Sequence, residues 1–359
     1  MKSRSKHKAA KIAGIVLAAV IVVFSVVSLI VVQSMFNDIF QRTVPAEQGL
    51  TGHLRYWDVE DQYDREAVSF LSGENRLYGH LYGAGNPDGL VVIAHGLGGG
   101  EESYLAQALY FVDQGYQVLC YSNTGCWDSE GKNCIGLNQS VLDLDAALDW
   151  VESESRFDGV PVFLFGHSWG GYAVAAIFHY GHEEIAASAS VAGFDRAMPM
   201  IMEWGEGMAG PLIYLEYPFI WLNQKFTYGS TLNVTAVDAI NSTDTPVLVL
   251  HGDNDTTVGY NTVSIISQKN RITNPNVEYF VCDQPMQNDH NKLFQSVESI
   301  QYVDRQNERY SALYDAYDGE IPESVQREFY AAVDKRLVDE PDQAFMERVV
   351  GFYRDSVGK

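Results

Sequence analysis

The chain has 359 residues, of which 46% are hydrophobic, and it carries 24 Lys and Arg against 47 Asp and Glu. This hydrophobic content excludes a largely disordered chain and suffices for one large α/β domain or two smaller domains. The formal charge of −23 disfavours binding to nucleic acid or to anionic lipid head groups.

The N-terminal region divides into a basic segment and an apolar segment. Residues 1–11 contain five Lys and Arg, and residues 12–32 contain no charge. An uncharged segment of this length can cross a bilayer as a helix, and the positive-inside rule then places residues 1–11 in the cytoplasm. We therefore expect a single-pass plasma-membrane protein with a retained anchor over 12–32, a polar stalk over 33–60 and one extracytoplasmic domain over 61–359. A cleaved signal peptide is the alternative, although its apolar stretch is normally shorter.

Eight β-like runs follow, and helical patterns alternate with them from the third run onward. Nearly continuous apolar strands that alternate with helices predict a mostly parallel sheet with helices on both faces. The runs cover 67–71, 76–82, 90–95, 117–122, 161–166, 186–191, 246–251 and 277–282. Residues 304–359 are acidic and helical in pattern, and their amphipathic end is expected to pack back on the sheet.

The four cysteines follow no metal-binding or redox pattern. The chain has no C-x-x-C pair, which disfavours a zinc site or a thioredoxin-type site. Cys126 and Cys134 lie in one loop at a separation that a disulfide can close, and an extracytoplasmic location permits such a bond. Cys120 and Cys282 each end a β-like run, where a buried free thiol is the usual outcome.

A long segment between the sixth and seventh runs, residues 195–244, interrupts the alternation and predicts an inserted cap. It contains four of the eight methionines and many aromatic residues. These side chains could line an adaptable pocket for an acyl chain, or they could pack the cap onto the body. Glu203, Glu206 and Glu216 offer a different use, because cap carboxylates can hold the N-terminal amine of a peptide.

The sequence GHSWGG at 166–171 places Ser168 between an apolar strand and a helical pattern. A sharp strand-to-helix turn of this kind exposes a serine hydroxyl above the sheet. Gly166 and Gly170 flank the serine, where the tight turn leaves no room for side chains. This context predicts that Ser168 is a nucleophile.

A nucleophilic serine needs a base, an acid that orients the base, and donors for an oxyanion. Asp255 follows the seventh run and His290 follows the eighth, so the chain order is Ser168, Asp255, His290. The backbone N–H groups of Leu97, in the HGLGGG loop after the third run, and of Trp169, directly after the serine, are the expected oxyanion donors.

Other residues compete for some of these roles. Asp253 is an alternative acid, and Asp195 after the sixth run is a more remote one. His95, His167 and His251 stand at strand ends, where histidines usually bond local backbone, and we interpret them as structural.

Four stretches, AHGLGGG, GHSWGGY, LHGDNDTTV and DHNKLF, resemble α/β-hydrolases of the serine aminopeptidase and monoacylglycerol lipase-like branch. The resemblance extends over about residues 60–359. It implies an α/β-hydrolase fold, with an eight-stranded, mostly parallel sheet, flanking helices and a helical cap between strands six and seven. It also implies a Ser-His-Asp hydrolase without a metal or organic cofactor, and its spacing favours Asp255 over Asp253.

These features favour a serine hydrolase that acts on small-molecule carboxylic esters with apolar or lipid-like acyl groups. An aminopeptidase-type amide hydrolase is the alternative, and a non-catalytic surface binding protein is a more remote one. The sequence leaves the natural substrate and the oligomeric state open.

Overall fold

All eight β-like runs form strands, and the strands pair into one sheet in the computed structural model, which describes residues 2–358. The strand order is β1-β2-β4-β3-β5-β6-β7-β8. Strand β2 is antiparallel to both of its neighbours, β1 and β4, and every other pair is parallel, as predicted. The strands are β1 (Arg65–Ser72), β2 (Asn75–Tyr82), β3 (Leu90–Ala94), β4 (Gln117–Tyr121), β5 (Val162–His167), β6 (Ile185–Val191), β7 (Val247–Gly252) and β8 (Val277–Cys282).

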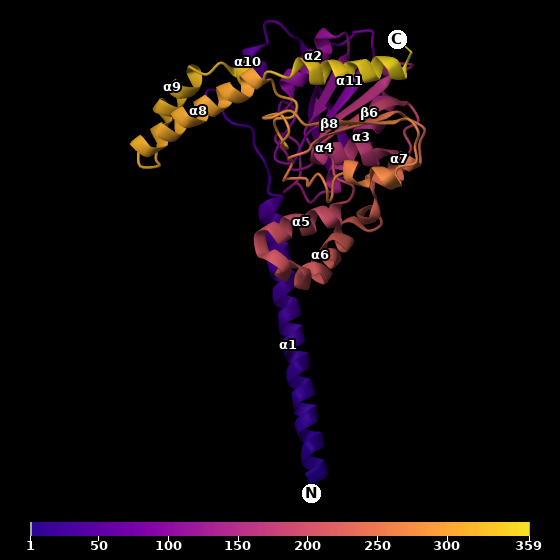
Figure 1. Ribbon diagram of the computed structural model, residues 1–359, viewed down its shortest axis with the longest axis vertical. Coiled ribbons are helices and arrows are strands. Elements are labelled where there is room, and N and C mark those ends of the chain that lie inside the picture. The colour runs from indigo at the N-terminus through magenta and orange to yellow at the C-terminus, as the bar shows by residue number, and fades with distance from the viewer. Residues whose placement is uncertain (1, 359) are drawn as a thin grey trace.

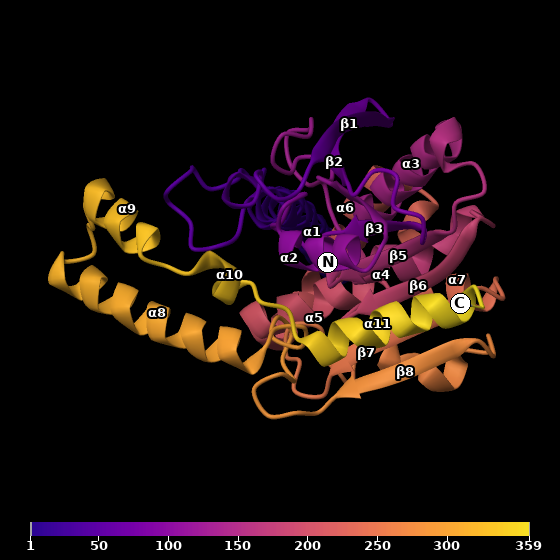
Figure 2. The same cartoon turned by 90° about the horizontal axis from the view of Figure 1, so that it is seen from above.

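Helices cover both faces of this sheet (Figures 1 and 2). Strands β3, β4, β5 and β7 are buried along their whole length, which explains their unbroken apolar sequences. One face packs against α2 (Leu105–Asp113) and α11 (Gln343–Ser356). The opposite face packs against α3 (Gln139–Ser153), α4 (Trp169–Ala176) and α7 (Ala236–Asn241).

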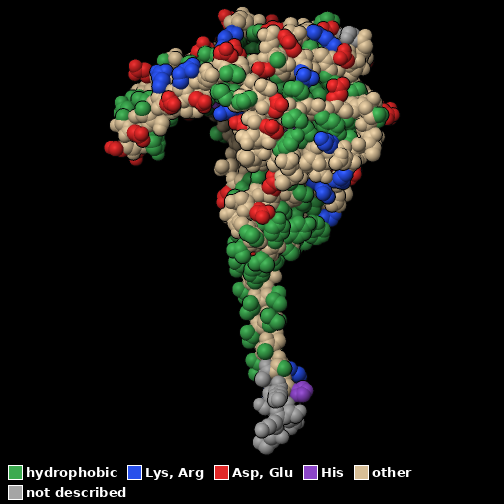
Figure 3. Space-filling view, viewed as in Figure 1, with side chains coloured by type: hydrophobic (Ala, Val, Ile, Leu, Met, Phe, Trp, Pro, Cys, Tyr) green, Lys and Arg blue, Asp and Glu red, His purple; other side chains and the backbone are tan. Residues whose placement is uncertain are grey.

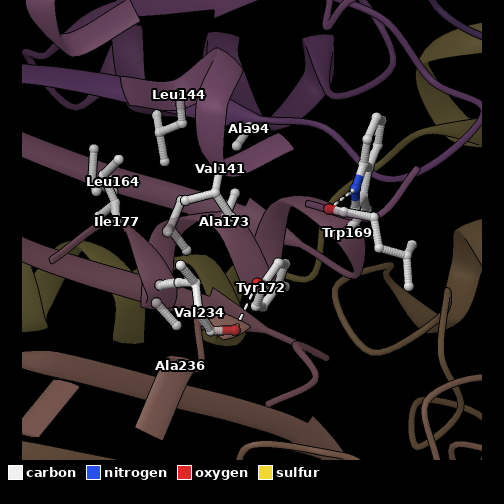
Figure 4. Packing of buried hydrophobic residues seen from close by; sticks show 14 of the residues in the cluster. Ala94, Val141, Leu144, Leu164, Trp169, Tyr172, Ala173, Ile177, Val234 and Ala236 are labelled. Carbon is white, nitrogen blue, oxygen red and sulfur yellow. Dashed lines mark hydrogen bonds between the residues drawn. The ribbon is translucent and has the colours of Figure 1, made fainter. Parts of the chain in front are cut away.

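Helix α4 is buried throughout and is held at both its start and its middle (Figure 4). The indole Nε1–H of Trp169 donates to the carbonyl of Leu137 at 2.7 Å. The hydroxyl of Tyr172 donates to the carbonyl of Val234 at 3.1 Å. Because α4 begins directly after Ser168, these contacts fix the position of the serine.

The C-terminal region contains an arm and a returning helix. Helices α8 (Val297–Ala316) and α9 (Glu323–Ala331) project from the body, and α10 (Lys335–Val338) leads back to it (Figure 1). Helix α11 then buries Phe345, Met346, Val349 and Tyr353 on the sheet, so the prediction that the amphipathic end packs there is confirmed.

Helix α1 (Lys2–Ile39) contains the predicted anchor and continues past it. It is the one helix among the described residues that is long and apolar enough to cross a membrane. In the predicted cytoplasmic segment 1–11, Met1 and the side chains of Lys2, Arg4 and Lys6 lie outside what the structure describes.

Residues 33–60 differ from the stalk that we expected. Phe36 and Phe40 are buried in the main core, and Leu54 and Val59 are buried in the second one. The apolar residues of this segment are widely spaced among polar ones, so the sequence showed no clear hydrophobic period that would predict their burial. Phe36 lies four residues after the buried Val32 and therefore on the same side of α1, and Phe40 follows just beyond the end of the helix.

The segment between β6 and β7 is helical, as predicted for the cap. It contains α5 (Ala197–Ala209), α6 (Ile213–Tyr228) and then α7. Helices α5 and α6 lie against the upper part of α1, below the sheet (Figure 1). The cap therefore packs on the same helix that carries the apolar N-terminal stretch.

Candidate active site

Ser168 stands at the turn between β5 and α4, at the carboxyl end of the sheet. Its backbone has φ 58° and ψ −111°, a conformation that is strained for a residue with a side chain. A Cβ at Gly166 would collide with the carbonyl oxygen of Gly170, and a Cβ at Gly170 would collide with that of Ala94. These glycines allow the close approach that turns the serine hydroxyl away from the sheet.

The structure brings together the three residues that the chain order suggested. His290 Nε2 lies 2.8 Å from Ser168 Oγ, and His290 Nδ1 lies 2.7 Å from Asp255 Oδ2. Asp255 and His290 are buried, whereas Ser168 is half-buried at the pocket. The imidazole is therefore placed between a hydroxyl and a carboxylate, an arrangement that can take a proton from the serine.

The Asp255 carboxylate is held by several donors. The N–H groups of Thr257 and Val258 donate to its Oδ1 at 2.8 and 2.9 Å, and His251 Nε2 lies 3.1 Å from its Oδ2. Burial alone would raise the pKa of Asp255, but the hydrogen bonds from His251 and His290 outweigh it and hold the pKa below its usual range. The carboxylate thus stays ionised beside His290.

The two alternative acids lie elsewhere. Asp253 accepts from the Asn288 side chain at the surface. Asp195 accepts from the N–H of Val237, at the start of α7.

His167 also contributes to the site, which the sequence interpretation missed. Its Nε2–H donates to the backbone carbonyl of His290 at 2.8 Å, and its Nδ1 accepts from the hydroxyl of Tyr104 at 2.7 Å. Burial, with the nearby His290, lowers the pKa of His167 to about 3, so the ring is neutral and can make both bonds. His167 thereby positions the loop that carries His290.

The other two strand-end histidines differ from each other. His95 donates to the carbonyl of the adjacent Gly96, which agrees with the structural interpretation, and it accepts from the N–H of Asn123. His251 reaches both Asp255 and the carbonyl of Val258. The signal that the sequence offered was the recurrence of histidine at the carboxyl ends of β3, β5 and β7.

The backbone N–H groups of Leu97 and Trp169 have no acceptor within residues 2–358. Trp169 is the first residue of α4, where an N–H has no partner inside the helix. Leu97 follows β3 and lines the pocket that holds Ser168. Two donors near the serine suit an oxyanion, which is the role expected for them.

Ser168 and His290 open into a pocket of about 500 Å³. Its apolar wall includes Leu97, Leu105, Phe294 and Trp204. Among the described residues of 195–244, Trp204 is the one that lines this pocket, and the four cap methionines do not. Of the two uses considered for these methionines, packing is the one that the structure supports: Met200 and Met202 are buried in the core and Met198 packs against it, whereas Met208 is exposed.

The three cap carboxylates are also engaged away from the pocket. Glu203 accepts from the N–H of Gly259, Glu206 from the hydroxyl of Tyr214, and Glu216 from the hydroxyl of Ser28. The pocket is instead bordered by a different acidic side chain, Asp339, which pairs with His53 at 2.8 Å.

Cys126 and Cys134 lie side by side in the loop region after β4. Their sulfur atoms are 3.4 Å apart and both thiols are free. The loop spacing thus brings the two thiols into contact, as expected, but no disulfide bond joins them.

Comparisons with known proteins agree with this architecture. Residues 85–224 match the family described as serine aminopeptidase, S33. A comparison with curated protein sequences gave no match. Among solved structures, an esterase from Pyrococcus furiosus is 19% identical, and the alignment covers 77% of this chain and 98% of that one with a TM-score of 0.52.

Two further solved structures align over less of the chain. An α/β-hydrolase from a Penicillium species is 17% identical over 68% of this chain and 97% of its own, with a TM-score of 0.48. Est1E from Butyrivibrio proteoclasticus, with bound ferulic acid, is 18% identical over 68% of this chain and 98% of its own, also with 0.48. The fold is that of the α/β-hydrolases, and the S33 match supports membership of that superfamily.

Proposed function

We propose that this protein is a membrane-anchored serine hydrolase that cleaves carboxylic esters. The observation that carries the proposal is the unbroken hydrogen-bonded series from Ser168 through His290 to Asp255, at a pocket of about 500 Å³. The unpaired N–H groups of Leu97 and Trp169 beside the serine support it.

The proposed reaction transfers an acyl group from an alcohol to water. His290 Nε2 takes the proton of Ser168 as Oγ attacks the carbonyl carbon, and the Leu97 and Trp169 amides bind the resulting oxyanion. The tetrahedral intermediate collapses, His290 returns the proton to the leaving alkoxide, and the alcohol departs. Water then attacks the acyl-serine with His290 again as base, which releases the carboxylic acid and restores Ser168.

The pocket favours esters over peptides. Its apolar wall suits an acyl chain. An aminopeptidase would need a carboxylate in the pocket to hold the substrate amine, but the three candidates bond other groups outside it: Glu203, Glu206 and Glu216. The wall around Trp204 and Phe294 therefore forms the proposed acyl site.

The anchoring part of the proposal rests on α1. Its apolar residues from Ile12 to Val31 are largely exposed, which in water would be costly, and the basic residues precede them. We infer a retained anchor with the hydrolase domain outside the cytoplasm.

A serine-directed fluorophosphonate tests the mechanism on the full-length protein in detergent. We expect labelling of Ser168, which Ser168→Ala abolishes while lowering kcat/KM by about 10⁴- to 10⁶-fold. Ser103→Ala is the matched control, since Ser103 lines the same pocket and its hydroxyl bonds the N–H of Gly100. Retained labelling in Ser168→Ala, or its loss in the control variant alone, would contradict the assignment.

A substrate series tests the ester preference. We expect kcat/KM on p-nitrophenyl esters to rise from acetate to medium-length chains, by up to about fourfold per methylene, until the pocket is filled. Faster cleavage of amino-acid amides than of any ester would favour the aminopeptidase.

A further inference from the structure

The outer surface of the cap is apolar, although it faces away from the body. Between Gly207 and Trp221 the sequence has a single charged residue, Glu216. Six side chains on this surface, which we call the cap face, are exposed: Met208, Leu212, Tyr214, Leu215, Tyr217 and Trp221. The exposed Glu206 carboxylate accepts from the Tyr214 hydroxyl, and it is the charged group bonded to this surface. Soluble proteins rarely expose so many large apolar side chains together.

The cap face is continuous with the apolar surface of α1. Figure 3 shows hydrophobic side chains gathered at the lower end of the body and down the emerging helix, whereas most charged side chains lie above them. The rings of Phe24 and Phe219 meet edge to face at 5.8 Å, which joins α1 to α6. One environment can therefore cover both surfaces.

One polar pair joins α1 to the cap inside their contact, and a second pair joins them at the exposed surface. Ser28, which is 2% exposed, donates to Glu216 Oε1 at 3.1 Å. Asn223 Nδ2 donates to Gln33 Oε1 at 2.9 Å. The Ser28–Glu216 pair places polar groups inside the contact and leaves apolar side chains outside it, which is the reverse of the arrangement that water favours and matches the arrangement found in lipid. The second oxygen of this carboxylate, Glu216 Oε2, has no hydrogen-bond partner among the described residues.

The length of α1 places this contact at the depth of the bilayer. At about 1.5 Å per residue, Phe24 lies roughly 20 Å along the helix from Lys11, and the hydrocarbon core is about 30 Å thick. If Lys11 marks the cytoplasmic boundary, Phe24 and the Phe219 ring against it lie within the outer half of the hydrocarbon. A cap held at this position cannot remain wholly in water.

We propose that the cap face is seated in the outer leaflet of the same bilayer that α1 spans. This inference rests on the proposed anchoring and adds a second membrane contact to it. Tyr214, Tyr217 and Trp221 would lie near the head groups, where aromatic rings with a polar atom are favoured. Helices α5 and α6 thus act as an interfacial unit beside the anchor.

The seated cap connects the bilayer to the proposed acyl site. A narrow apolar pocket between α1 and the cap is lined by Val32, Phe36, Ile201, Ile220 and Trp204. Trp204 also lines the pocket of Ser168. Trp204, a side chain of the membrane-seated unit itself, therefore forms part of the wall of the proposed acyl site.

Spin-label accessibility in phosphatidylcholine vesicles tests the proposal on the full-length protein. Nitroxides are attached to three single variants, Leu215→Cys, Leu71→Cys and Ile21→Cys. The native cysteines are buried, and the unsubstituted protein measures any label that they take up. Leu215 and Leu71 are matched, since they are 62% and 57% exposed, but Leu71 lies on β1 away from the cap. Ile21 reports the anchor alone.

We expect the labels at positions 215 and 21 to be reached by oxygen more than by a water-soluble nickel complex, and the label at 71 to show the opposite. A label at 215 that resembles the one at 71, while the label at 21 lies in lipid, overturns the proposal but leaves the anchoring intact. Water accessibility at position 21 overturns the anchoring and this inference with it. Spin–spin broadening at position 215 with low access to both reagents would mean that a second copy of the chain covers the cap face, which also overturns it.

Discussion

The carboxyl end of the sheet holds the triad of Ser168, His290 and Asp255, and we call it the triad end. It differs from the surface formed by α1 and the cap in what its side chains contact. Asp255, His290 and His167 each bond groups of the same chain, at 2.7 to 3.1 Å. The cap face and α1 instead present apolar side chains that nothing in residues 2–358 covers. The chain by itself thus completes the proposed chemistry, whereas the second region needs an environment other than water.

The largest expected effect sharpens this comparison at the triad end. We expect His290→Ala to lower kcat/KM by about 10⁴- to 10⁶-fold and Asp255→Asn by a somewhat smaller factor, because each breaks the series that activates Ser168. Asp253→Asn is the matched control, since Asp253 bonds Asn288 at the surface, and it should have almost no effect. Ester hydrolysis by the full-length protein measures all three. If Asp253→Asn were the more damaging aspartate variant, the acid would be assigned wrongly.

A smaller effect is expected where α1 enters the body. Phe36 is buried, and Phe36→Ala should lower the free energy of unfolding by about 3 to 5 kcal/mol through the cavity that it leaves. Ile30→Ala, an exposed position on the same helix, should cost much less. Unfolding of the full-length protein in detergent measures both. If both variants lowered the free energy of unfolding equally, residues 33–40 would not pack as part of the body. The buried and the exposed parts of α1 would then not differ.

The smallest effect is the contribution of two buried histidines, His167 and His95, to the pH dependence of stability. Burial lowers the pKa of His167 to about 3 and that of His95 to about 4, whereas both would titrate near 6.5 in the unfolded chain. Below pH 6.5 the unfolded state therefore binds more protons, and the free energy of unfolding falls as the pH falls. Between pH 7 and pH 5.5 we expect a loss of about 1 kcal/mol for each histidine.

A variant separates this effect from general acid sensitivity. His167→Gln should reduce the pH dependence of unfolding between pH 7 and pH 5.5, and the exposed His179→Gln should leave it unchanged. Denaturant unfolding at a series of pH values is the measurement. An unaltered slope in His167→Gln would show that the buried ring does not carry the effect.

Much of the architecture and of the candidate site could be predicted from the sequence. The eight strands, the helical cap and the packing of α11 follow from hydrophobic period and from breaks in it, which are local properties. Ser168 is recognisable because its glycines, the strand before it and the helix after it are neighbours in the chain. Asp255 and His290 follow from strand order, since parallel strands bring their carboxyl ends to one edge.

Only the tertiary structure decided which side chains meet across long distances in the chain. His167 bonds the backbone of residue 290, Met200 and Met202 enter the core instead of the pocket, and residues 33–60 pack on the body. The sequence gives the polarity of these side chains but not their contacts, because a histidine, a methionine or a widely spaced phenylalanine can pack or form hydrogen bonds at many places in a fold. Hydrophobic period and strand order can be read from residues that are close in the chain. Contacts between distant residues depend instead on how side chains fit together in the close-packed interior of the folded protein.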